Sequence, residues 1–332
     1  MTADPVRTIA DAVLYEGYIL WPYRRSALKN QRRFTFGGVY PPSHSRDHPD
    51  DPATMRTEVL VVASDSATVE VTVRFLQIVR RAAARRRGDE LEELDELTVA
   101  GERYMTWEEA VEREIDVAPT ALGAIAQRPR TVVVAIPAGR EVEELPGGGA
   151  LVRSWEELAG EVSASAERLQ IPDAWRLSVE INNTTWFAGD GRQQALAQTF
   201  CSTHTLLRAP DGAFASLADP PEELRPAAGA CRNAGTWPVL VGDPGARSTV
   251  LSSPIILEDY PRVAPESPGD LFDGGEIDQL LVLNILALTD EEKAEMAASD
   301  PRAREILERT EALSPEQLMA LHGAVREFGM TR

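Results

Sequence analysis

The sequence predicts an α+β protein with a strand-rich N-terminal region, a mixed middle and a helical C-terminus. Through much of the first half, β-branched and aromatic residues alternate with polar ones, whereas helix-start signals gather near the end. The 332 residues exceed the usual size of one domain. We therefore expect a strand-rich domain at 1–140, a mixed α/β domain at 141–288 and a C-terminal helical segment at 289–332.

The first part of the chain contains most of the predicted strands. Their composition is typical of half-buried strands, and they are expected at 12–20, 32–40, 57–63, 68–79 and 130–139. Proline, aspartate and histidine predict a loop at 41–52. The stretch "RRAAARRRGDELEELDEL" changes from basic to acidic, and it is compatible with a helix or with a flexible excursion.

A helix is predicted over 154–169. Ser154 and Glu157 have the spacing of a capping box, and apolar residues from Trp155 to Leu169 recur at helical intervals. The next segments are expected to be a strand at 175–186, a helix that turns into a strand at 191–207, a hairpin with its turn at Asp211-Gly212, and strands at 235–242 and 248–257.

Three helix starts follow one another at the C-terminal end. They are predicted at Thr289 with Glu292, at Asp300-Pro301 and at Ser314-Pro315, which combine capping side chains with prolines at the first helical position. Since they lie so close together, the end of the chain is expected to be a series of short helices.

The charge is distributed unevenly along the chain. The net charge is −19, yet residues 1–87 hold 14 Arg and Lys against 9 Asp and Glu. Such asymmetry can mark an interaction surface. The acidic majority argues against nucleic acid as the main partner, because phosphate binding needs a positive field.

Several other classes are disfavoured by the sequence. No apolar run is long enough for a transmembrane helix, and two cysteines cannot form a disulfide framework. The first residues lack the features of a signal peptide. We therefore expect a cytoplasmic protein without a transmembrane segment.

Cys201 and His204 are candidate ligands for a transition metal, and Cys231 is a third. Thiolate and imidazole suit zinc, iron or nickel. The sequence has neither a Cys-x-x-Cys nor a His-x-x-x-His pair, however, and a buried cysteine beside a hydrogen-bonded histidine is the more common arrangement. The cofactor is therefore unknown, with a transition metal as one option.

Residues 258–278 contain seven carboxylates between two apolar stretches. They provide no EF-hand spacing, and prolines and glycines predict a connector that leads into a helix near Glu276. As an alternative, the loop is a recognition edge in which Glu266, Asp270 and Asp273 contact a protein partner.

The segment "WPYRRSALKNQRRFTF" interleaves basic and aromatic residues. The simple interpretation is two strands joined by a basic turn. The alternative is a docking surface for an acidic protein, which would use Arg24, Arg25, Lys29, Arg32 and Arg33.

His44 and His48 lie in the 41–52 loop together with Asp47, Asp50 and Asp51. Adventitious binding of a divalent metal is conceivable there, but a solvated loop is the favoured interpretation. The glycine-rich stretches of the chain lack the Gly-Lys-[Ser/Thr] ending of a phosphate-binding loop.

Four stretches carry a resemblance to a known family: "VLYEGYILWPYRRSALKNQRRFTFGGVYP", "FCSTHTLL", "NAGTWPVLVGDPG" and "LSSPIILEDYPRVAPESPGDLFDGGEIDQLL". The chain resembles a protein family encoded, mainly in actinobacteria, inside gene clusters for high-affinity, actinobacterial-type [NiFe] hydrogenases. The resemblance covers nearly the whole length. It implies a genomic context, not a reaction or a set of catalytic residues.

Three hypotheses follow from the residues and the resemblance. The first is a non-catalytic accessory or assembly factor that docks on a hydrogenase subunit or maturation factor. The second is a metal-dependent enzyme that uses Cys201, His204 and carboxylates of 258–278. The third is a structural subunit of the hydrogenase complex.

Overall fold

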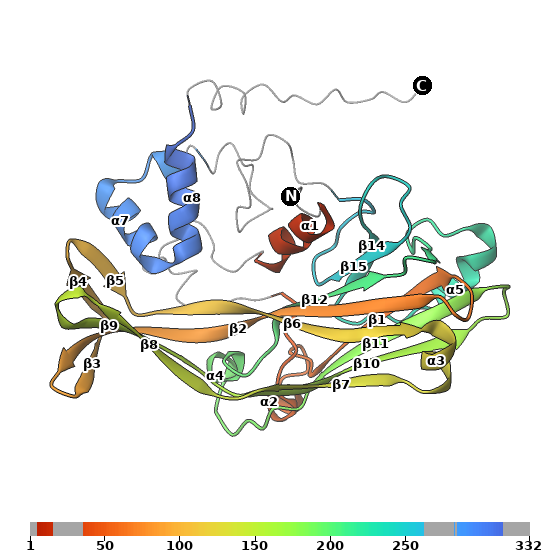
Figure 1. Cartoon of the computed structure of the whole chain (residues 1–332), viewed down its shortest axis with the longest axis horizontal. Coiled ribbons are helices and arrows are strands. Elements are labelled where there is room, and N and C mark those ends of the chain that lie inside the picture. The colour runs from red at the N-terminus through yellow and green to blue at the C-terminus, as the bar shows by residue number, and fades with distance from the viewer. Residues whose placement is uncertain (1–4, 16–35, 262–281, 283, 315–332) are drawn as a thin grey trace.

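Two antiparallel sheets pack face to face and form the body of the protein in the computed structural model (Figure 1). The structure describes residues 5–15, 36–261, 282 and 284–314. The molecule is elongated, and its long axis follows the strands of the larger sheet (Figure 1).

The smaller sheet has five strands in the order β13-β1-β11-β10-β7. They are β1 (Thr54–Val62), β7 (Arg130–Ile136), β10 (Leu158–Arg168), β11 (Ala174–Asn183) and the short β13 (Ala213–Phe214). β1 and β10 pair with opposite edges of β11. The two long flanking strands therefore bury β11 at the centre of this sheet.

The larger sheet is organised around β2 (Thr68–Arg87), which is 20 residues long. One edge of β2 pairs first with β12 (Cys201–Arg208) and then with β9 (Gly149–Trp155); the other pairs with β6 (Trp107–Ala121) and then with β3 (Glu90–Leu94). The sheet is completed by β15 (Thr249–Ser253), β14 (Trp237–Leu240) and β8 (Gly139–Leu145). A separate hairpin consists of β4 (Glu96–Val99) and β5 (Glu102–Met105).

The main hydrophobic core lies between the two sheets. Alternate residues of β2, among them Val71, Val73 and Phe75, pack with alternate residues of β11 and β10, as the two-residue period of a strand requires. Phe75 and Phe200 stack with their ring centroids 4.6 Å apart. A Cβ atom at Gly160 would lie 2.6 Å from the Phe200 ring, so the close approach of β10 to this ring requires glycine.

The helices are short and lie mostly outside the sandwich. α1 (Pro5–Leu14), α7 (Asp290–Ser299) and α8 (Pro301–Glu311) lie on the outer side of the larger sheet (Figure 1). The others are α2 (Pro42–Asp47), α3 (Leu122–Gln127), α4 (Arg192–Leu196), α5 (Arg225–Gly229), and the 3₁₀ turns η2 (Pro146–Gly148) and η3 (Glu222–Leu224). None of the helices in the described part of the chain combines the length and hydrophobicity needed to span a lipid bilayer.

The predicted α+β class is confirmed, with strands through the N-terminal and middle regions and helices at the C-terminal end. The capping box of Thr289 and Glu292 begins α7, and Asp300 caps α8 by accepting a hydrogen bond from the backbone N–H of Arg302 at 2.9 Å. The helix predicted after Ser314 lies outside the described residues. The predicted strands 57–63, 68–79 and 175–186 correspond closely to β1, β2 and β11.

The helix predicted over 154–169 is wrong, because this segment contains the end of β9 and the whole of β10. Leu158, Val162 and Ala164 all face the core between the sheets, and their even spacing is the period of a strand as well as a near match to a helix. Trp155 belongs to β9 instead, where its indole Nε1 donates a hydrogen bond to the carbonyl of Pro137 at 3.1 Å. The segment of β10 therefore adopts a strand conformation because it pairs with β7 on one edge and with β11 on the other.

The segment 80–97 forms neither a helix nor a flexible excursion from the sheet. It continues β2 and then forms β3 and the start of β4. Ala82 and Ala84 pack with Val152 on one face, while Ala83 packs with Leu97 on the other. Alanine and arginine both favour helices, but small residues at alternate positions allow neighbouring strands to approach.

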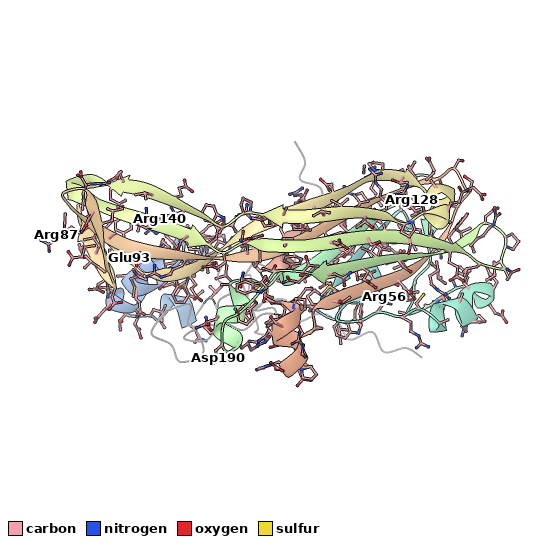
Figure 2. All side chains as sticks on the ribbon, turned by 90° about the horizontal axis from the view of Figure 1, so that it is seen from below. Arg56, Arg87, Glu93, Arg128, Arg140 and Asp190 are labelled. Atoms are coloured by element: carbon pink, nitrogen blue, oxygen red, sulfur yellow. The ribbon has the colours of Figure 1, made fainter. Side chains whose placement is uncertain are left out.

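The basic end of β2 is neutralised within the sheet. Arg80 pairs with Glu93 at 2.6 Å, Arg87 pairs with Glu92 at 2.6 Å, and Arg86 pairs with Glu144. Figure 2 shows Arg87, Glu93 and Arg140 together at this end of the molecule. The excess of arginine in residues 1–87 therefore partly reflects cross-strand ion pairs, not a free basic surface.

Other segments also differ from expectation. Residues 12–14 of the predicted strand 12–20 belong to α1, whose Val13 packs on Val239. From the predicted strand 32–40, Val39 forms an isolated bridge with Phe200. The turn at Asp211-Gly212 forms, but the β13 strand that follows it pairs with β1 in the other sheet.

The predicted domain boundary at residues 140/141 falls within β8. Strands from both sides of this position pair in each sheet: β9 and β12 pair with β2, and β10 and β11 lie in one sheet with β1. The division into 1–140, 141–288 and 289–332 stays a prediction about folding units.

Candidate functional site

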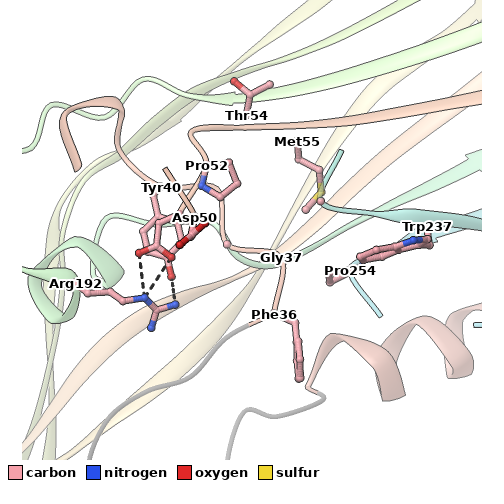
Figure 3. A pocket seen from close by; sticks show the side chains of 13 residues that line it. Phe36, Gly37, Tyr40, Asp50, Pro52, Thr54, Met55, Arg192, Trp237 and Pro254 are labelled. Carbon is pink, nitrogen blue, oxygen red and sulfur yellow. Dashed lines mark hydrogen bonds and ion pairs between the residues drawn. The ribbon is translucent and has the colours of Figure 1, made fainter. Parts of the chain in front are cut away.

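The candidate site is a pocket of about 370 Å³ at one side of the sandwich (Figure 3). It combines the segment before β1 with α4 and with the residues around β14 and β15. Its lining consists of Phe36, Gly37, Gly38, Tyr40, Asp50, Asp51, Pro52, Thr54, Met55, Arg192, Gly235, Trp237 and Pro254. The volume lies at the lower end of the range of ligand pockets and suits one or two side chains.

Backbone pairing holds the walls of the pocket together. Val39 and Phe200 exchange two backbone hydrogen bonds of 2.9 and 3.1 Å. Tyr40 donates its N–H to the carbonyl of Pro52 at 2.8 Å, which closes the segment containing α2 into a loop. The pocket is therefore bounded by chain that is tied to the edge of the sandwich.

The buried side chain of Asn183 is a further link. Its Nδ2 donates to the carbonyls of Val39 at 2.9 Å and Gln198 at 2.8 Å, and its Oδ1 accepts from the N–H of Thr185 at 2.8 Å. These bonds join the pocket wall at Val39 to the turn that follows α4. Asn183 therefore supports the pocket without lining it.

A network of polar side chains forms one end of the pocket. Arg192 Nε lies 3.1 Å from Asp51 Oδ2, and Arg192 Nη2 donates to the Tyr40 hydroxyl at 2.5 Å (Figure 3). On the other side of the carboxylate, His44 Nε2 lies 3.0 Å from Asp51 Oδ2. Tyr40 and His48 stack on the His44 ring at centroid distances of 5.3 and 4.3 Å. Five side chains are thus fixed relative to one another.

The network determines the charge at this end. Burial by itself raises the pKa of Asp51, but hydrogen bonds from His44 and Arg192 outweigh that effect and hold the pKa below its ordinary value. Burial also raises the pKa of Tyr40. At neutral pH the Asp51 carboxylate is therefore ionised and paired with Arg192, while the Tyr40 hydroxyl keeps its proton.

The other end of the pocket is apolar. The side chains of Trp237 and Phe36 are 45% and 38% exposed, whereas Met55 is buried at the base. Gly37 has φ +54°, and a Cβ atom there would lie 2.4 Å from Cβ of Pro254. Glycine thus lets the chain pass close beneath Pro254, in a conformation that other residues rarely adopt.

The structure does not bring the three predicted metal ligands together. Cys201 and His204 lie opposite Leu76 and Arg74 of β2, on the outer face of the larger sheet. Cys231 packs near Leu60 on the outer side of the smaller sheet. The sandwich core separates Cys231 from the other two, and no group of three His, Cys, Asp or Glu side chains suited to a metal occurs among the described residues.

Cys201 and His204 share a face because of a β-bulge. The register between β12 and β2 shifts between these two residues, and Ser202 has φ +50°. The N–H groups of Ser202 and Thr203 donate to the carbonyls of Phe36 and Gly37, each at 3.1 Å. The bulge therefore supports the segment that begins the pocket.

The predicted partner-binding residues lie outside the described residues. These are Arg24, Arg25, Lys29, Arg32, Arg33, Glu266, Asp270 and Asp273. From the carboxylate-rich stretch 258–278, Glu258 and Asp259 are described, and Asp259 Oδ1 accepts a hydrogen bond from the N–H of Leu240 at 2.8 Å. That carboxylate has a structural role beside β14.

Sequence reasoning missed the polar network. The loop 41–52 contains the short helix α2, His44 is buried, and its ring contacts the Asp51 carboxylate, so a fully solvated loop is wrong. Tyr40 and Arg192 were not candidates. The closely spaced histidines and aspartates of 44–51 were a signal, but nothing in the sequence indicated that Arg192 lies beside them.

Replacing Asn183 with alanine is expected to lower the free energy of unfolding by about 2–4 kcal/mol. The Gln198 carbonyl and the Thr185 N–H lose the Asn183 side chain as partner, and the Val39 carbonyl keeps only the N–H of Phe200 among the described residues. Asn182→Ala is the matched control: its side chain contacts Thr54 and Glu180 at the surface, and its loss should cost less than about 1 kcal/mol. Guanidinium-induced unfolding followed by tryptophan fluorescence measures both. Equal losses in the two variants would contradict the supporting role of Asn183.

Neither a family model nor a curated protein sequence matches the chain.

Proposed function

We propose that the protein is a non-catalytic, cytoplasmic accessory or assembly factor that docks on a protein partner. The resemblance described above suggests the partner, which is a subunit of a [NiFe] hydrogenase or a component of its maturation machinery. In this proposal the pocket near Trp237 is the centre of the docking surface.

The observation that carries the proposal is the half-exposed Trp237 at the mouth of a recess whose polar end is already organised. Tryptophan, tyrosine and arginine are the residues most often found at the energetic centres of protein interfaces. Here Trp237, Tyr40 and Arg192 line one pocket. A preformed recess of this kind reduces the cost of ordering side chains on binding.

The pocket is of the right size for a local contact in a larger interface. Its volume of about 370 Å³ accommodates an anchor residue of a partner, as hot-spot residues commonly insert into pockets. The flanking Phe36 adds apolar surface next to Trp237. A docked partner would bury these aromatic side chains and gain the hydrophobic contribution of their area.

The test is an affinity pull-down of the tagged protein from its host under conditions that induce hydrogenase, read by mass spectrometry. Wild type is compared with Trp237→Ala and with Trp186→Ala. Trp186 is the matched control because its side chain is 81% exposed and does not line the pocket.

Hydrogenase subunits or maturation factors should be recovered with wild type and with Trp186→Ala, and recovery should fall about tenfold or more with Trp237→Ala. A protein that emerges without either class of partner contradicts the proposed function. If the partner is recovered equally with both variants, the proposed partner still stands, but the pocket is not the docking surface.

A further inference from the structure

The described lining of the pocket near Trp237 carries an excess of negative charge. Among the described residues, it contains two carboxylates, Asp50 and Asp51, and a single guanidinium, Arg192. Arg192 is engaged with Asp51, which leaves the exposed Asp50 without an ion-pair partner among the described residues. The part of the pocket that the structure describes therefore presents one uncompensated carboxylate, Asp50, to a ligand.

This excess of negative charge selects against anionic ligands. A carboxylate or phosphate would need the fork of Arg192, but Asp51 already lies 3.1 and 3.3 Å from its Nε. Burial raises the pKa of Asp51, but hydrogen bonds from His44 and Arg192 outweigh that effect and hold the pKa low. The Asp51 carboxylate therefore stays charged and competes with an anionic ligand for Arg192. A cationic group on the ligand has Asp50 as its natural counter-ion.

The aromatic walls favour the same kind of ligand. Trp237 and Phe36 stand at the rim (Figure 3), whereas the Tyr40 ring at the inner end already contacts Arg192 and His44. Cations are attracted to aromatic faces, and tryptophan is the strongest of the three. Pro52, Pro254 and Met55 complete the lining with apolar surface, which suits an aliphatic or proline side chain next to the charge.

We propose that the pocket recognises a protein segment in which an apolar or proline residue adjoins an arginine or lysine, with the basic side chain at Asp50 and the apolar one against Trp237 and Pro254. This inference rests on the proposed function and specifies the chemistry of the partner. Segments with prolines commonly dock on aromatic-lined grooves, and the volume of about 370 Å³ matches a pair of side chains.

The test uses the full-length protein labelled with fluorotryptophan and observed by fluorine NMR. The chain has six tryptophans, and the Trp237 resonance is assigned from the Trp237→Phe variant. The probes are capped pentapeptides Ac-Ala-Leu-Pro-Xaa-Ala-NH₂, with Xaa either arginine, glutamine or glutamate, together with Ac-Arg-NH₂ as the free basic residue.

The arginine peptide should shift the Trp237 resonance saturably and bind at least about tenfold more tightly than the glutamate peptide, with the glutamine peptide between them. Asp50→Asn should reduce this preference about fivefold or more. Asp47→Asn should leave it unchanged, because Asp47 lies in the same loop and does not line the pocket. Added salt should weaken the arginine peptide most.

Equal binding of the arginine and glutamate peptides, or no shift at Trp237 with any of them, overturns the inference. Binding of Ac-Arg-NH₂ as tight as that of the arginine peptide overturns it as well, because the ligand would then be a small guanidine compound and not a protein segment. These failures are distinct from failure of the proposed function, which the pull-down tests without reference to the peptides.

Discussion

Replacement of Arg81 with methionine is expected to lower the free energy of unfolding by about 3–5 kcal/mol. Arg81 is 5% exposed, and its Nη1 donates to Glu109 Oε1 at 2.8 Å. Its Nη2 lies 3.1, 3.0 and 2.9 Å from the carbonyl oxygens of Met105, Ala298 and Ser299. The substitution thus leaves several buried carbonyls without this partner, and, among the described residues, the Glu109 carboxylate keeps only Arg153, whose Nε donates to its Oε2 at 2.9 Å.

Arg81 also joins the helical end of the chain to the larger sheet. α7 ends at Ser299, and the last carbonyls of a helix carry partial negative charge. The guanidinium at this point favours the packing of α7 and α8 on β2 and β6. Limited proteolysis of Arg81→Met should therefore cleave the α7–α8 region faster than in wild type.

Arg80→Met provides the control for this prediction. Arg80 is the neighbouring residue on β2, but its side chain is 50% exposed and its ion pair with Glu93 lies at the surface. Its loss should cost less than about 1 kcal/mol. Urea-induced unfolding measures the loss of stability in the two variants. Similar losses in both, with unchanged proteolysis of α7 and α8, would contradict the role assigned to Arg81.

Wild-type protein is expected to lose about 2 kcal/mol of stability between pH 7 and pH 5 through His204. Burial lowers the pKa of His204 from 6.5 to about 4; the hydrogen bond to Ser202 opposes this effect, and the positive charge of Arg74 adds to it. The Nδ1 atom lies 2.5 Å from the carbonyl of Ser202, and Nε2 has no hydrogen-bond partner among the described residues. Protonation would place an unpaired charge inside the protein.

The direction in which stability changes with pH follows from proton uptake by the unfolded chain. Between pH 6.5 and about 4 the unfolded chain binds a proton at His204 that the folded protein excludes. The stabilising contribution is therefore complete above pH 6.5 and is lost as the pH falls toward 4. Asp51 and Glu58 also have lowered pKa values, but their contributions are lost at lower pH, as the pH falls below the ordinary values of 3.8 and 4.5.

His204→Leu should remove this part of the pH dependence. Urea-induced unfolding at pH 7 and pH 5 gives the change in stability for each protein, and the difference between wild type and variant isolates His204 from His44 and His48. The expected result is a smaller loss in the variant by about 2 kcal/mol. The same loss in both proteins would contradict a neutral, buried His204.

The strands of the sandwich could be predicted where side chains alternate on one buried face. Val69, Val71 and Val73 of β2 show this plainly, and the caps at Thr289 and Asp300 depend on local chemistry that the sequence displays directly. The errors occur where two periods compete. In 154–169 the helical and strand patterns share several positions, and the pairing of β10 with β7 and β11 is not visible in the segment itself.

The candidate pocket could not be predicted because its parts are distant in sequence. Asp51 and Arg192 meet only when the loop before β1 and the start of α4 are brought together at the end of β11. Conversely, Cys201 and Cys231 looked promising because they are the only cysteines, yet they lie on opposite sides of the core. The residue types suggested a metal site, but the topology of the fold keeps the two cysteines apart.

Site-specific photo-crosslinking in the host tests directly whether a partner docks at the pocket near Trp237. A benzoylphenylalanine residue is placed at Thr54, which lines the pocket and is exposed, and in a control protein at Thr131, which is equally an exposed threonine but lies on β7. We expect a crosslink from position 54 to a hydrogenase subunit or maturation factor and none from position 131. A crosslink to such a partner from position 131 alone, or no crosslink from position 54, would contradict docking at the pocket.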